Sequence, residues 1–178
     1  MTSPVLGVGR DGLHQLRAGL ERVLGPAAAP LLQEMGFAGA AGLHAALRAW
    51  IRSRFQVAEP GVLEARHLGD ALAGFFEDQG WGTLRLSRIS DGVLALDAPD
   101  WAEAVPGSST APACHVSAGV FAELFSRLAE APFAAMEVEC RSRGDARCRF
   151  LLAAPTSLTA IYERMTRGEP APTDAPTS

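Results

Sequence analysis

The stretch of residues 114–150, CHVSAGVFAELFSRLAEAPFAAMEVECRSRGDARCRF, changes from a helical to a strand-like hydrophobic period. In residues 114–130 the apolar side chains recur at helical spacing, and the stripe expected to be buried contains Val120, Phe121, Leu124, Phe125 and Leu128. Residues 133–141 and 146–153 instead predict a β-hairpin around the turn Arg143-Gly144-Asp145. A helix followed by an antiparallel hairpin is therefore the expected building unit of the fold.

The rest of the chain extends this unit with further helices and a second hairpin. Apolar spacing predicts helices over residues 13–24, about 30–55 and 68–80, a hairpin over 81–88 and 93–97, a loop over 98–112, and a last helix opened by Pro155. Because hairpins pair antiparallel, we expect an α+β fold with helices packed on one face of a roughly four-stranded antiparallel sheet made of two hairpins. We expect one domain over residues 5–166 and a disordered tail over residues 167–178, which is rich in Pro and Thr.

Three cysteines are placed where their sulfur atoms can meet. If the hairpin turn centres on Gly144, Cys140 faces Cys148, with Cβ atoms about 4.5–5.5 Å apart. Strict alternation then puts Met136, Val138 and Cys140 on the face that carries Cys148, Phe150 and Leu152. Cys114 begins a helix, where the unpaired backbone N–H groups favour a thiolate. Docking this helix start on the apolar face would bring three sulfurs together at one metal ion; the competing interpretation is three buried cysteines acting as small apolar side chains.

A closed zinc site needs a fourth ligand, and three side chains are candidates. Glu137 and Glu139 both fall on the wrong face of a regular strand, so either carboxylate requires a bulge just before Cys140. His115, next to Cys114, is the alternative. Three thiolates and a carboxylate around Zn²⁺ carry a net charge of about −2, which four arginines of this hairpin are expected to compensate: Arg141, Arg143, Arg147 and Arg149.

Composition excludes several classes of function. The formal net charge of −4 argues against an electrostatic nucleic-acid binder, and no apolar run is long enough to span a membrane. All 16 cationic side chains are arginine, which excludes lysine-dependent phosphate loops and Schiff bases. Residues 7–12 fit G-x-G-x-x-G but lack the strand-turn-helix context of a dinucleotide site. Without a signal-peptide pattern, we expect a cytoplasmic protein.

The cysteine-bearing segment resembles the 4-vinyl reductase domain family. The resemblance is carried by a Cys at a helix start, E-x-x-C and G-D-x-x-C-x-F in residues 114–150, by HLGDALAGFFEDQGWGTLRL in residues 67–86, and by the Gly-rich second helix. It implies a small ligand-binding fold shared with transport-particle subunits. In aromatic-sensing members of the family, three Cys and one Glu bind a structural zinc, and the matching residues here are Cys114, Glu137, Cys140 and Cys148. The resemblance thus selects Glu137 as the fourth ligand.

The expected function is a non-enzymatic, zinc-stabilised domain that senses or carries a hydrophobic small molecule, with a homodimer as the expected assembly. Aromatic side chains on elements that should meet near the zinc are the expected pocket residues: Phe75, Trp81, Trp101, Phe121, Phe125 and Phe133. The alternative is a bacteriochlorophyll-pathway protein, either a vinyl-group reductase or a tetrapyrrole precursor carrier; no credible nicotinamide or flavin site supports catalysis. A ligand-free assembly subunit is a third hypothesis. The His–Trp pair that grips phenol in the family's sensors has no obvious match, so phenol is not implied.

Overall fold

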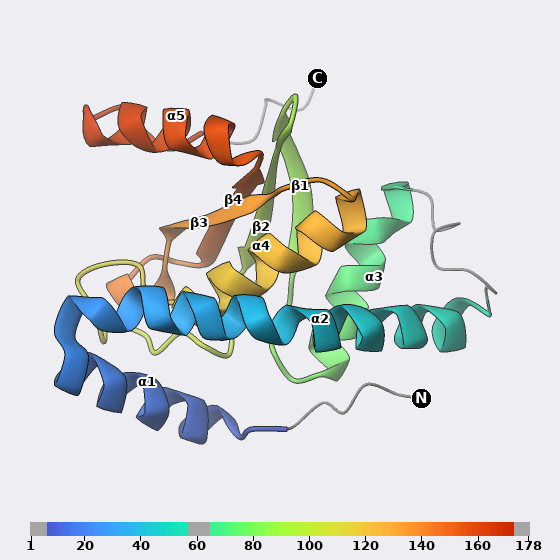
Figure 1. The fold of residues 1–178 in the computed structure, drawn as a ribbon, viewed down its shortest axis with the longest axis horizontal. Helices are drawn as coiled ribbons and strands as arrows, with labels where there is room; N and C mark the ends of the chain where they lie inside the picture. The colour runs from blue at the N-terminus through green and yellow to red at the C-terminus, as the bar shows by residue number, and fades with distance from the viewer. Residues whose placement is uncertain (1–6, 57–64, 173–178) are drawn as a thin grey trace.

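The computed structural model describes residues 7–56 and 65–172, which form a four-stranded sheet between helices (Figure 1). The elements follow the predicted order: α1 (Arg10–Leu24), η1 (Gly25–Ala27), α2 (Ala28–Phe55), α3 (Ala65–Asp78), β1 (Arg85–Ser90), β2 (Val93–Ala98), α4 (His115–Ala129), β3 (Ala134–Glu139), η3 (Arg141–Arg143), β4 (Cys148–Ala153) and α5 (Pro155–Thr166). The tail expected from residue 167 onward lies partly outside the described residues.

The sheet has the strand order β1-β2-β4-β3, and all three neighbouring pairs are antiparallel. Each predicted hairpin is present, and β2 and β4 join the two in the middle of the sheet. The predicted α+β fold with a four-stranded antiparallel sheet is therefore confirmed. Among the described helices, none combines the length and the apolar character that a membrane crossing requires.

The first strand is shorter than predicted. Strand β1 begins at Arg85, whereas the alternating pattern extends it back to residue 81. Gly80 and Gly82 have φ angles of +77° and +114°, a backbone conformation that breaks an extended strand. Trp81 and Thr83 hydrogen-bond to the loop after β2 instead. The Thr83 N–H donates to Asp100 Oδ1 over 2.7 Å, and the Trp81 carbonyl accepts from the Ala102 N–H over 2.7 Å.

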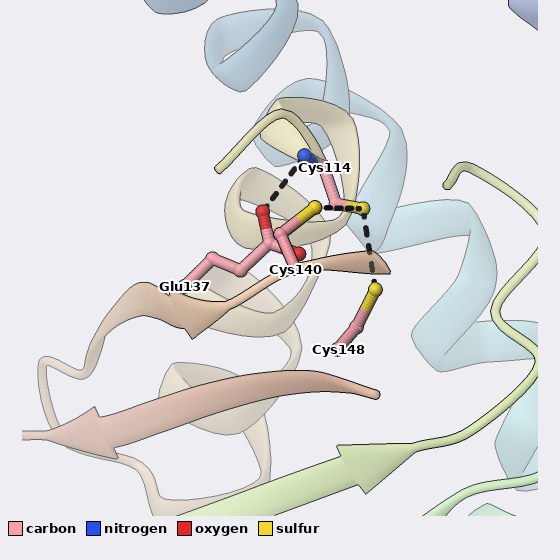
Figure 2. A group of neighbouring side chains, drawn as sticks. All are labelled: Cys114, Glu137, Cys140 and Cys148. Atoms are coloured by element: carbon pink, nitrogen blue, oxygen red, sulfur yellow. Dashed lines mark hydrogen bonds between the residues drawn. The ribbon is translucent and has the colours of Figure 1, made fainter. Parts of the chain in front are cut away.

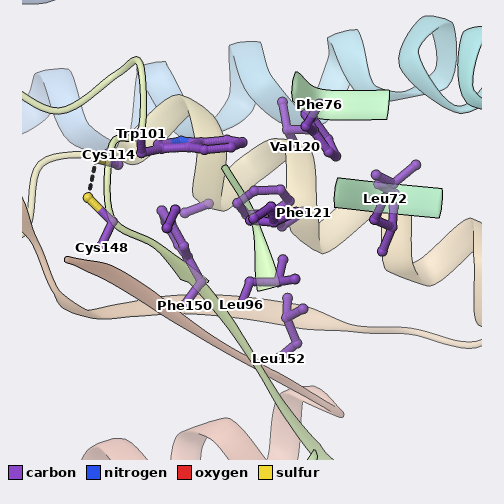
Figure 3. Packing of buried hydrophobic residues seen from close by; sticks show 14 of the residues in the cluster. Leu72, Phe76, Leu96, Trp101, Cys114, Val120, Phe121, Cys148, Phe150 and Leu152 are labelled. Carbon is purple, nitrogen blue, oxygen red and sulfur yellow. Dashed lines mark hydrogen bonds between the residues drawn. The ribbon is translucent and has the colours of Figure 1, made fainter. Parts of the chain in front are cut away.

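Helices cover both faces of the sheet. Leu96 and Phe150 belong to the large core beneath α2, α3 and α4, where Phe121 and Trp101 complete a set of tightly packed aromatic rings (Figure 3). The opposite face of β2 and β4 packs against α5 in a second, smaller core, so the last helix adds a cover that the other helices do not provide (Figure 1). The cysteines lie in the large core, at the end where α4 begins.

Helices α2 and α4 cross with their backbones in contact. A Cβ atom added at Gly36 would lie 2.0 Å from the Val116 carbonyl oxygen, and one added at Gly119 would lie 2.0 Å from that of Gln33. Glycine is therefore required at both positions for the crossing, as the Gly-rich sequence of α2 suggests. A Cβ atom added at Gly39 on the same helix would meet nothing within 4 Å, so Gly39 is not part of this backbone contact.

Candidate metal centre and neighbouring groove

A β-bulge in β3 decides which side chains face the helix start. Glu137 is opposite Phe150 while Glu139 is opposite Arg149, so Val138 is an extra residue between them. This is the distortion that a carboxylate ligand requires, and it puts Glu137 on the face that carries Phe150. The prediction that Met136 and Val138 share that face is wrong: the one-residue shift turns both into the core beneath α5.

Four side chains converge at the first turn of α4 (Figure 2). The Sγ atom of Cys114 lies 3.8 Å from the Sγ of Cys140 and 3.8 Å from that of Cys148. With Glu137 included, one ligand atom from each of the four residues lies within 4.8 Å of all the others. A tetrahedron with Zn–S bonds of about 2.3 Å has sulfur–sulfur edges of about 3.8 Å. The spacing of the sulfur atoms therefore fits a zinc ion.

The carboxylate of Glu137 is half satisfied. Its Oε2 atom accepts a hydrogen bond of 2.9 Å from the Cys114 N–H, whereas its Oε1 atom is buried without a hydrogen-bond partner among the described residues. A buried carboxylate oxygen without a partner is costly, and a bound cation would remove that cost. The orphaned oxygen and the three nearby sulfurs together form a donor set suited to zinc.

Protonation equilibria in the cluster are strongly coupled. Burial, with the neighbouring Cys140 thiol, raises the pKa of Glu137 to about 8. Hydrogen bonds from Cys114 and Cys148 lower the pKa of the Cys140 thiol, while the bond to Cys140 raises the pKa of the Cys114 thiol. The protonated forms of Glu137 and Cys114 are therefore favoured. A divalent cation replaces those protons on binding, so metal affinity should increase with pH.

Backbone amides hydrogen-bond to the ligand atoms of the cluster. The Ala113 and Arg141 N–H groups hydrogen-bond to the sulfurs of Cys140 and Cys148, and the Cys114 N–H bonds to Glu137. The expectation that the hairpin arginines compensate this charge is not met by Arg143, Arg147 and Arg149. These three form ion pairs with Asp145, Glu139 and Asp97, respectively.

The two rival ligands lie outside the cluster. Glu139 pairs with Arg147, whose Nε lies 2.9 Å from Oε2. His115 is half buried on the first turn of α4, where burial lowers its pKa, but it does not belong to the group of four. The resemblance implied the same four residues that the structure brings together.

Sequence reasoning missed a buried carboxylate that caps α4. Glu103 is completely buried and accepts hydrogen bonds of 2.9 Å from the Val116 N–H and 2.8 Å from the Ser117 N–H. The Ser117 hydroxyl also donates to Glu103 and accepts a bond of 2.7 Å from Trp101 Nε1. A carboxylate at this position satisfies N–H groups that the helix leaves unpaired and is stabilised by the helix dipole. Nothing in the local pattern of the loop identifies Glu103, because its partners come later in the chain.

A buried arginine attaches α1 to the same region. The Arg17 Nη1 atom donates to the backbone carbonyls of Glu103 and Ala113 over 2.9 and 3.3 Å. The side chain is 5% exposed although it falls in an amphipathic surface helix. Arg17 therefore holds two residues against α1: Ala113, which precedes Cys114, and Glu103, which caps α4.

Replacing Glu103 by glutamine should change the pH dependence of stability. Burial, opposed by the bonds from Ser117 and Val116, raises the pKa of Glu103 from 4.5 to about 6. An acid with a raised pKa in the folded state stabilises the protein below its ordinary pKa, and that contribution is lost as pH rises through about 6. Glutamine does not titrate and leaves one donor unpaired, at a cost of about 1–3 kcal/mol. Urea unfolding between pH 4.5 and 7 should show a smaller decrease in the free energy of unfolding with pH in E103Q than in wild type. The same decrease in both proteins would contradict a raised pKa for Glu103.

An apolar groove lies between α1, α2 and the start of α4, next to the cluster of four potential ligands. It has a volume of about 460 Å³. We call it the α1–α2 groove, and its lining residues are Gly7, Val8, Arg10, Leu13, Leu16, Met35, Gly36, Gly39, Gly42, Leu43, Gln79, Gly80, Trp81, Ala102, Val116 and Val120. Val116, two residues after Cys114, brings the groove to the helix turn that holds the cysteine.

The six aromatic residues expected to form a pocket separate into two groups. Trp81 lines the α1–α2 groove. The other five lie in the large core or, in the case of the last, pack against it half buried: Phe75, Trp101, Phe121, Phe125 and Phe133. Trp101 lies next to Trp81 with ring centroids 5.4 Å apart, so it supports the groove wall from behind. That the core aromatics contact a ligand stays a prediction.

Comparison with known proteins identifies the segment that carries the cluster. Residues 102–154 match the family model of the 4-vinyl reductase domain. The resemblance to this family is thereby confirmed; the matched segment does not extend to residues 67–86 or to the Gly-rich second helix, which also carried the resemblance. The matched segment contains all four residues of the cluster and Glu103. Among curated proteins, none is significantly similar to this chain in sequence.

Solved structures with the same fold include a sensor and a trafficking subunit. The phenol-responsive sensory domain of the transcription activator PoxR, solved with phenol, is 19% identical over 93% of this chain and 84% of that chain, with a TM-score of 0.62. A trafficking protein particle complex subunit 3 from Naegleria fowleri, covalently bound to palmitic acid, is 11% identical over 82% of this chain and 96% of that chain, with a TM-score of 0.57. A vinyl-4-reductase family protein from Methanocaldococcus jannaschii is 20% identical over 68% of this chain and 66% of its own, with a TM-score of 0.46.

Proposed function

We propose that this protein is a zinc-stabilised domain that binds a hydrophobic small molecule, as a sensor or carrier. The observation that carries the proposal is the position of an apolar groove of about 460 Å³ beside the cluster of four potential metal ligands. Val116, in the first turn of α4, lines the groove, and Cys114, at the start of the same helix, belongs to the cluster. The match to the 4-vinyl reductase domain and the similarity to a phenol-responsive sensory domain support a small-molecule ligand. The fold of that sensory domain is shared, but its ligand is not transferred to this chain.

Cys114, Glu137, Cys140 and Cys148 would hold the zinc, whose chemistry here is structural. Four protein ligands complete a tetrahedral zinc, so no open position is left to activate water or substrate. The residues themselves attach the start of α4 to the β3–β4 hairpin. Amide donors from Ala113, Arg141 and Cys114 orient the ligand atoms. Because Cys114 begins the helix that lines the groove, this attachment also fixes one wall of the groove.

A single native mass spectrum of the protein purified from its own host tests the proposal. We expect the mass of the chain plus one zinc ion and one bound organic molecule, and a doubled chain mass if the expected homodimer forms. A chain that carries zinc but no small molecule, and that binds no member of a panel of apolar compounds, would contradict the sensor or carrier function. A bound tetrapyrrole would instead favour the pigment-carrier alternative.

A further inference from the structure

The α1–α2 groove has one ionisable lining residue, Arg10, among many apolar ones. Arg10 lies at the start of α1 and is exposed, and the structure gives it no ion pair among residues 7–56 and 65–172. Gln79, which follows α3 on the other side of the groove, adds a polar amide to the lining. The lining therefore offers one positive charge and one amide beside an apolar floor.

The dimensions of the groove suit a small amphipathic molecule. Its volume of about 460 Å³ is typical of small-molecule pockets, about 300–1,000 Å³. Leu16 and Met35 on its rim are 47% and 42% exposed, whereas Val116 and Val120 on its floor are buried. An occupant would bury its apolar part against the floor and leave its other end near water, where an exposed guanidinium can bind it.

Gly39 keeps the groove open. Its position on α2 faces open space, unlike Gly36 one turn earlier, where a Cβ atom would collide with the backbone of α4. A larger side chain at residue 39 would therefore project into the groove without disturbing the helix crossing. This makes residue 39 the place to block the groove in a folded protein.

We propose that the α1–α2 groove binds an apolar molecule with an anionic head group, and that Arg10 binds that head group. This inference rests on the proposed function, because it assigns the position and the chemistry of the ligand. The occupant is a small molecule rather than a second copy of the chain, because the groove has the volume of a small-molecule pocket and the positive charge lies at the groove itself. If a second copy of the chain binds at the rim instead, the test below distinguishes that result.

Two probes that share one skeleton separate the apolar part from the head group. 8-Anilinonaphthalene-1-sulfonate carries a sulfonate, and N-phenyl-1-naphthylamine is the same molecule without it. Fluorescence titration of the full chain should give saturable binding of both probes, with the anionic probe bound more tightly. Arg10→Gln should raise the dissociation constant of the anionic probe by roughly fivefold, which is the upper end of the effect of an exposed ion pair, and leave the dissociation constant of the neutral probe unchanged.

Filling the groove should affect both probes. Gly39→Leu should raise the dissociation constant of each probe by more than tenfold, whereas Gly19→Leu should change neither dissociation constant. Gly19 is a matched control because it lies on α1 in open space and does not line the groove. Circular dichroism and thermal melting confirm that the variants are folded, since these probes also bind loosely packed states.

Four outcomes decide the proposal. Loss of both probes in Gly39→Leu with selective loss of the anionic probe in Arg10→Gln supports it. Unchanged binding in Gly39→Leu overturns the position of the site, although the protein would still bind apolar molecules and the proposed function would stand. Equal effects of Arg10→Gln on both probes overturn the anionic preference. Binding that disappears as the chain dimerises with rising concentration assigns the groove to a second copy and overturns the proposal.

Discussion

Replacing Cys148 by serine should remove the zinc and sharply lower thermal stability. Cys148 is fully buried and its sulfur is 3.8 Å from that of Cys114, so serine leaves an incomplete site that a single hydroxyl does not restore. Binding free energy of a structural zinc is folding free energy, so the variant loses the stabilisation that bound zinc supplies. A ligand in thousandfold excess over its dissociation constant contributes about 4 kcal/mol. For a chain of this length, that loss corresponds to a decrease in melting temperature of roughly 8–16 °C.

Inductively coupled plasma mass spectrometry and differential scanning calorimetry measure the two effects on the same samples. We expect about one zinc per wild-type chain and much less in C148S. Two neighbouring carboxylates of β3 provide the matched comparison: Glu137→Gln should bind zinc more weakly and carry less of it as purified, whereas Glu139→Gln should retain it because Glu139 pairs with Arg147. Full zinc content in C148S would refute the assignment of the cluster.

The same substitution at two glycines of α2 should have opposite effects on stability. Gly36→Ala puts a methyl group 2.0 Å from the Val116 carbonyl oxygen and 2.9 Å from its carbon. These are backbone atoms, which cannot rotate away, so α2 and α4 must separate. Overpacking of this kind costs about 1–3 kcal/mol or more. Because α4 begins at the cysteine cluster, the same displacement should weaken zinc binding.

Gly39→Ala is the control for Gly36→Ala. Its added methyl group meets nothing within 4 Å, so only the preference of the helix for alanine remains. That preference should stabilise the protein by roughly 0.5–1 kcal/mol. Urea denaturation with both variants in the same buffer measures the difference. Changes of the same sign at the two positions would contradict the backbone contact between α2 and α4.

Local patterns predicted the elements and part of the four-residue cluster. The turn at Gly144 placed Cys140 near Cys148, and the helical spacing after Cys114 placed that residue at a helix start. Alternation alone could not choose Glu137, because the choice depends on a bulge at Val138 that leaves no periodic signal. The family resemblance supplied that ligand, and the register of β3 and β4 now gives the physical reason.

Long-range partners are what the sequence could not predict. Glu103 and Arg17 are charged residues in positions that read as a loop and as the surface of a helix, yet both are buried by contacts with residues 13–96 positions away in sequence. Three of the four arginines of the hairpin, Arg143, Arg147 and Arg149, pair with carboxylates outside the cluster. Aromatic residues identify an apolar interior, but whether each fills the core or lines a groove depends on how the helices dock.

X-ray absorption at the zinc edge is the most direct test of a metal ion that joins the start of α4 to the β3–β4 hairpin. The chain loaded with one equivalent of zinc should show three sulfur neighbours at about 2.3 Å and one oxygen neighbour at about 2.0–2.2 Å. Glu137→Gln should change the oxygen shell and leave the three sulfur neighbours. A shell with two or fewer sulfurs, or with an imidazole nitrogen in place of the oxygen, would contradict the cluster of Cys114, Glu137, Cys140 and Cys148.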